Sequence, residues 1–126
     1  MAKLVIKGPC SRYTLKDIMC CVFGLKNFDV SVYFTLLKYG KLKVNEISEK
    51  LNRDRSTVQR AVQNLINAGI VHRRQVNIKE GGYVYVYEAV PFENIKSEIK
   101  TTMNKWCKSV ESWINSINEN DIGEEL

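Results

Sequence analysis

The side chains best suited to contact a polyanion lie between residues 54 and 68, at the spacing of one helix side. Arg, Gln and Asn can each form two parallel hydrogen bonds, to a base edge or to a phosphate. The polar side of this predicted helix comprises Ser56, Gln59, Arg60, Gln63 and Asn67. Its apolar side comprises Val58, Val62 and Leu65. We therefore expect a helix that is anchored by one side and free to form hydrogen bonds with the other.

The positive charge of the chain is concentrated around the same segment. The 126 residues contain 19 Lys and Arg against 14 Asp and Glu, a net charge of +5. Residues 41–80 contain nine of the basic and four of the acidic residues, so this block accounts for the whole excess. A local basic block is typical of proteins that bind nucleic acid, although it also occurs on surfaces that only face solvent.

The elements that must position these side chains follow from hydrophobic periodicity and from helix caps. Apolar residues recur at helical spacing in four segments, at about 14–23, 30–39, 44–51 and 54–68. Asp29 and Asp54 are expected to cap the second and fourth helices, and Ser11 or Thr14 the first. Glycines are expected to end three of these helices, at Gly24, Gly40 and Gly69.

The periodicity changes after the fourth helix, where β-branched and aromatic residues become frequent. Residues 71–78 and 83–88 are predicted to form two strands, joined by a turn at 79–82 that contains two glycines. Tyr83, Tyr85 and Tyr87 share one face of the second strand. This face is suited either to packing or to stacking on bases, and packing is the commoner role.

A last helix is predicted from Phe92 to about Ile117, after Pro91. At about 26 residues it would be roughly 39 Å long, which exceeds the side of a small helical core. Part of its apolar stripe therefore needs cover, either from its own core or from a second copy of the chain, and we favour the second copy. The predicted dimer interface comprises Ile99, Met103, Trp106, Val110, Trp113 and Ile117.

The predicted order of a short helix, a tight turn, a second helix and a hairpin is that of a winged helix-turn-helix. The fold class is therefore mainly α with a small β-hairpin wing (α+β), followed by a long C-terminal dimerisation helix. We expect an N-terminal arm at 1–12, the winged helix at 13–90, the dimerisation helix at 91–118 and a frayed acidic tail at 119–126. In such a fold the second helix of the pair enters the major groove of DNA, and the wing approaches the backbone or minor groove. The predicted DNA contacts are Arg55, Ser56, Thr57, Gln59, Arg60, Gln63, Arg73, Arg74 and Lys79.

Residues 23–91, about 70 of the 126, resemble the winged-helix domain of TrmB-type transcriptional regulators and, more loosely, the MarR group. The resemblance rests on the segments 32–40, 47–51, 54–62 and 65–71, of which 54–62 matches the recognition helix of the family. It implies a dimeric, DNA-binding transcriptional regulator from a prokaryote, with an archaeon favoured. Larger TrmB-type proteins have a C-terminal sugar-binding domain, whereas here one long helix and a tail follow the wing. No small-molecule effector is therefore implied.

Several other classes of protein are not expected. No apolar run is long enough to span a membrane, and the first residues are too short and charged for a secretory signal, so we expect a cytoplasmic protein. The single histidine, His72, and the lack of a Gly-rich phosphate loop argue against an enzyme, a metal site or a cofactor.

Two alternatives accompany the regulator hypothesis. A winged helix can also act as a protein-interaction module of the transcription machinery that contacts no bases. The four cysteines, Cys10, Cys20, Cys21 and Cys107, are expected to be reduced structural thiols. A thiol sensor is the variant hypothesis, since Cys20 and Cys21 on the first helix could meet Cys107 on the last.

Overall fold

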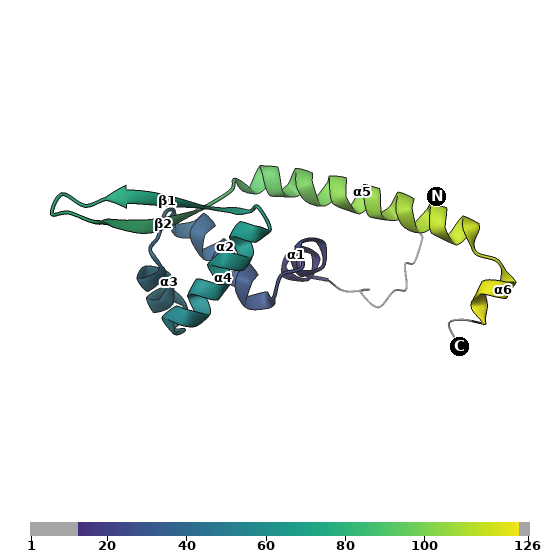
Figure 1. Cartoon of the computed structure of the whole chain (residues 1–126), viewed down its shortest axis with the longest axis horizontal. Coiled ribbons are helices and arrows are strands. Elements are labelled where there is room, and N and C mark those ends of the chain that lie inside the picture. The colour runs from purple at the N-terminus through teal and green to yellow at the C-terminus, as the bar shows by residue number, and fades with distance from the viewer. Residues whose placement is uncertain (1–12, 124–126) are drawn as a thin grey trace.

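The computed structural model describes residues 13–123. Four helices form the body, a two-stranded hairpin extends from it on one side, and a long helix extends away on the other (Figure 1). The predicted arm at 1–12, with Cys10 and Ser11, lies outside the described residues. The elements are α1 (Leu15–Phe23), α2 (Asn27–Tyr39), α3 (Val44–Leu51), α4 (Arg55–Asn67), β1 (Val71–Asn77), β2 (Tyr83–Ala89), α5 (Phe92–Ser116) and α6 (Glu119–Ile122).

The helix starts agree with the predicted caps except at α2. The Thr14 hydroxyl accepts the Asp17 N–H, and the Asp17 carboxylate accepts the Thr14 N–H, which closes a capping box. We predicted Asp29 as the N-cap of α2, but this is wrong, because that helix begins at Asn27. Its carboxylate instead accepts the Lys26 N–H at 3.0 Å from the third helical position. A carboxylate at the third position still satisfies a free N–H group at the helix start. Asp29 therefore does indicate the start of α2, but it lies three residues after the N-cap.

The core lies between α2, α3, α4 and the hairpin. Its largest fully buried side chain is Tyr33 of α2, whose hydroxyl donates to the Val90 carbonyl at 2.7 Å. Burial raises the pKa of Tyr33 to about 12, so the phenol keeps its proton and this bond. Asn64 of α4 donates to the buried Asp29 carboxylate at 3.3 Å. These bonds join α2 to α4 and to the junction between wing and α5.

The hairpin pairs antiparallel, with Arg73 opposite Tyr87 and Gln75 opposite Tyr85. Ile78 and Gly82 close its turn by a hydrogen bond of 3.1 Å, and Gly81 and Gly82 have the positive φ angles that glycine adopts without a steric penalty. Leu42, between α2 and α3, exchanges two backbone hydrogen bonds with Tyr87, of 2.8 and 3.1 Å. The inner part of β2 is therefore held on both edges, by β1 and by Leu42.

Helix α5 starts against the body and then leaves it (Figure 1). Its first turns pack against α1 and the core, where Ile95 is fully buried. The tail differs from the frayed end that we predicted, because Glu119–Ile122 forms the short helix α6, with the Asn118 side chain accepting the Asn120 N–H. In residues 13–123 no single helix has the length and apolar content to cross a membrane; α1 and α2 meet these criteria only as a pair bent by 112°.

Candidate nucleic-acid interface

Helix α4 has the two distinct sides that its sequence predicts. Val58, Ala61, Val62 and Leu65 are buried against α2 and α3. The opposite side is exposed and comprises Arg55, Ser56, Gln59, Arg60 and Gln63. Arg55 and Arg60 form no ion pair with any of residues 13–123. The two guanidinium groups are therefore available to an external anion.

The N-terminus of α4 is occupied by the carboxylate of Asp54. This carboxylate accepts the hydroxyl of Ser56, the hydroxyl of Thr57 at 2.5 Å and the Thr57 N–H at 3.1 Å. The hydrogen bonds from the Ser56 and Thr57 side chains hold the pKa of Asp54 well below its usual range. Both hydroxyl protons are thus directed at Asp54, so Ser56 and the partly buried Thr57 have acceptor oxygens but no ready donor for a phosphate. Arg55 and Arg60 remain the charged donors on the exposed side of this helix.

Both glutamines of α4 have an amide that is already held by a neighbour. Gln63 donates from Nε2 to the Asn67 Oδ1 one turn later, at 2.9 Å. Gln59 donates from Nε2 to the Tyr87 hydroxyl on β2, at 3.4 Å. In each case one amide N–H is used and the amide oxygen is left as an acceptor on the exposed side of the helix.

The hairpin separates two adjacent arginines. Arg73 lies on the same face as Tyr85 and Tyr87, and its guanidinium stacks on the Tyr85 ring with 4.3 Å to the centroid. Arg74 lies on the other face and donates to the Glu88 carboxylate at 3.2 Å, while Lys41 approaches the same carboxylate at 3.4 Å. Desolvation would raise the pKa of Glu88, but the hydrogen bonds and charges of Arg74 and Lys41 outweigh it and lower the pKa. Of the two arginines, only Arg73 shares the face that packs on α4.

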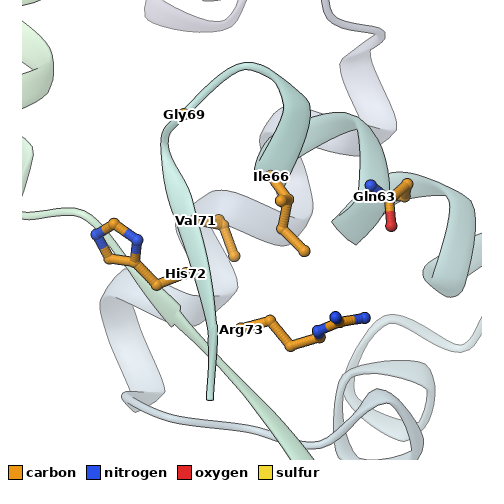
Figure 2. Close-up of a pocket in the computed structure, with 6 residues that line it drawn as sticks. All are labelled: Gln63, Ile66, Gly69, Val71, His72 and Arg73. Carbon is orange, nitrogen blue, oxygen red and sulfur yellow. The ribbon is translucent and has the colours of Figure 1, made fainter. Parts of the chain in front are cut away.

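A shallow, open depression of about 370 Å³ lies between α4 and β1. Figure 2 shows Gln63 and Ile66 on the helix side, with the Arg73 guanidinium extending from β1 beneath them. His72 points away on the other side of the strand. The structure thus brings Gln63 and Arg73, which we predicted separately as DNA contacts, to the rim of one concave surface. Lys79 is exposed in the hairpin turn and does not line this depression.

The outer half of α5 has an apolar side that residues 13–123 leave open to solvent. Trp106 is 65% exposed, Trp113 is 53% exposed and Met103 is 45% exposed. Val110 and Ile117 are partly exposed on the same stripe. Ile99 differs from the rest of the predicted dimer interface, because it packs against the core of its own chain. Intrachain packing therefore covers the beginning of the stripe and ends near Ile99.

The cysteines of the described chain are free thiols. Cys20 is partly buried and its Sγ donates to the Asn27 side chain at 3.5 Å, while Cys21 and Cys107 are exposed. Desolvation, aided by the charges of Asp17 and Asp29, raises the pKa of Cys20 and disfavours its thiolate. This weighs against Cys20 as a sensor. The thiol-sensor hypothesis stays a prediction for Cys21 and Cys107.

The fold and its exposed basic helix define a winged helix-turn-helix protein. The family model described as "Sugar-specific transcriptional regulator TrmB" matches residues 19–93. The chain is 56% identical over 125 residues to "Uncharacterized protein MJ1503" of Methanocaldococcus jannaschii, covering 99% of this chain and 95% of that protein. It is 40% identical over 109 residues to "Uncharacterized protein MJ1082" of the same organism, covering 86% and 90%.

A solved structure described as "Possible transcriptional regulator from Methanosarcina mazei Go1" has a TM-score of 0.78 and 26% identity. The match covers 94% of this chain and all of that one. The chain belongs to the TrmB family, a family of transcriptional regulators. The predicted TrmB resemblance, winged-helix fold and archaeal affinity are therefore confirmed.

One contact of the interface could not be predicted from the sequence. The three tyrosines of β2 were expected to pack, and Tyr87 does pack, with 2% of its surface exposed. Its hydroxyl nevertheless reaches a side chain on the exposed side of α4, 28 residues away in the chain. The available signal was the choice of Tyr rather than Phe at an inward-facing position, which indicates a polar partner without naming it.

Proposed function

We propose that this protein is a homodimeric regulator that binds specific sequences of double-stranded DNA. Helix α4 enters the major groove, and the wing lies on the backbone or in the minor groove. The observation that supports this most strongly is the exposed side of α4. There, exposed guanidinium groups and two oriented amides share one surface, and the opposite side is fixed in the core. Arginine and glutamine are the side chains that pair best with base edges.

Within this proposal the residues have different roles. Arg60, Gln59 and Gln63 contact base edges, because they lie on the middle of the exposed side. Arg55, Arg73 and Lys79 contact phosphates. Ser56 and Thr57 accept hydrogen bonds or serve only the cap, since Asp54 takes their protons. Arg74 has a smaller role than its neighbour because Glu88 already pairs with it.

The homodimer is supported by the outer half of α5. Trp106, Val110, Trp113 and Ile117 follow one another at steps of four, three and four residues, so they form one stripe. A second copy that covers this stripe would present two recognition helices to successive major grooves, roughly 34 Å apart. We therefore expect a pseudo-palindromic binding site.

The test is a selection of duplexes by the full chain from a library with about 25 random base pairs, which is room for two half-sites. We expect enrichment of a pseudo-palindrome whose affinity falls steeply with salt. The double variant R60A/Q63A should lose about tenfold to a thousandfold in specific affinity but much less in non-specific affinity. The control variant K100A removes a positive charge from α5, outside the interface, and should keep the preference.

The opposite result is equally clear. A folded protein that enriches no sequence and binds DNA weakly, without dependence on salt, would contradict the proposal. It would favour the alternative, a winged-helix module that binds another protein of the transcription machinery.

A further inference from the structure

The wing contacts the exposed side of α4 through the side chain of Tyr87. Tyr87 is almost fully buried, its backbone N–H and carbonyl are both hydrogen-bonded to Leu42, and it lies opposite Arg73 of β1. Its hydroxyl therefore has a fixed position. The Gln59 amide, on an exposed side chain, donates to that hydroxyl at 3.4 Å. A buried group of the wing thus contacts an exposed side chain of α4.

We propose that Tyr87 is a positioning residue that sets the base preference of Gln59. This inference rests on the proposed function and deepens it. Without a partner, a glutamine amide can present either its N–H₂ or its oxygen to the groove. With one N–H directed at Tyr87, it presents the oxygen as an acceptor and keeps one N–H as a second donor.

This orientation selects among the four bases. In the major groove adenine and cytosine display amino donors, whereas guanine and thymine display carbonyl acceptors. An amide held with its oxygen outward favours the amino bases. Adenine is favoured most, because its N6 amino group donates to the oxygen and its N7 accepts the remaining N–H. We therefore assign an adenine, or second best a cytosine, to the position that Gln59 contacts.

The other glutamine provides a comparison within the same helix. Gln63 is held by Asn67 of its own helix, at 2.9 Å, so its orientation does not depend on the wing. The wing should therefore influence the base opposite Gln59 and leave the base opposite Gln63 unchanged. A general loss of fold or of affinity would affect both positions alike.

The experiment uses the full chain and the duplex obtained by selection. Each half-site base pair is replaced in turn, and the position that Q59A makes insensitive to replacement is identified as the Gln59 position. The variant Y87F removes only the hydroxyl. We expect it to reduce the preference for adenine over guanine at that position by about three- to tenfold, with the Gln63 position unaffected. In the Q59A background, Y87F should have no further effect on base preference.

Two controls separate positioning from stability. Y33F removes another buried hydroxyl, the one bonded to the Val90 carbonyl, and should lower the melting temperature without changing base preference. N67A should alter preference at the Gln63 position only. The inference is overturned if wild-type protein binds specifically and Y87F keeps the full preference, or if Y87F changes preference equally with and without Gln59. If wild-type protein selects no sequence at all, the proposed function fails instead.

Discussion

The apolar side of α4 is buried, whereas the apolar side of α5 is exposed along its outer half. Val58, Val62 and Leu65 contact the body of the same chain, but Trp106 and Trp113 each keep more than half of their surface exposed. Both helices are amphipathic, and both place large apolar residues on one stripe. An apolar stripe therefore indicates which side of a helix needs cover but not which molecule provides it.

The largest effect expected from this comparison concerns stability. L65A should lower the free energy of unfolding by about 2–5 kcal/mol, because it removes a fully buried side chain and leaves a cavity. I114A, at a position 54% exposed on α5, should change it by less than about 0.5 kcal/mol. Urea unfolding at submicromolar protein concentration measures both. Equal losses would mean that α5 is folded against its own body in solution.

The next effect concerns assembly. W106E/W113E should turn the dimer into a monomer and weaken binding to a two-half-site duplex by about a hundredfold, since the second half-site is then no longer bound by a linked partner. Sedimentation velocity and titration with the selected duplex measure the two effects. S112E adds a negative charge on the polar side of the same helix and should leave the dimer intact. Wild-type protein that sediments as a monomer at micromolar concentration would refute the dimer.

A smaller effect compares the two faces of the wing. R73A should reduce DNA affinity by about three- to tenfold and lower the magnitude of the salt slope by about one, as expected for one phosphate contact. R74A, the neighbouring residue paired with Glu88, should reduce it by less than about twofold. The DNA affinity of each variant, measured at several salt concentrations, distinguishes R73A from R74A. Equal losses of DNA affinity for R73A and R74A would show that the two faces of the hairpin contribute alike to DNA binding.

The smallest effect concerns the cap of α4 and its dependence on pH. The folded-state pKa of Asp54 is lowered, so its contribution to stability is present above the unfolded value of about 3.9 and is lost as pH falls below it. D54A should lower the melting temperature at neutral pH by a few degrees, and this difference should shrink in acid. D54N keeps a side-chain oxygen that can cap the helix, so its melting temperature should fall less than that of D54A. A difference between wild type and D54A that persists unchanged well below pH 3.9 would contradict this role.

Much of the fold follows from local sequence. The two strands with their turn, the Gly24 and Gly69 helix ends, and the Thr14 and Asp54 caps depend on a few neighbouring residues, and all of them agree with the structure to within one residue. The exposed side of α4 was predictable for the same reason, because a period of 3.6 residues divides a helix into two sides. The start of α2 was misplaced, since a carboxylate at the cap and one at the third position both satisfy the same N–H groups.

The sequence predicts α1 to α5 closely, together with the apolar side of each and the accumulation of basic residues in 41–80, but it did not predict α6. Packing between distant segments accounts for the contact of Tyr87 with Gln59, for the different partners of Arg73 and Arg74, and for the end of the intrachain cover of α5 near Ile99. The physical reason is the range of the interactions. Caps and periodicity act over a few residues of one segment, whereas these contacts join segments that only packing brings together.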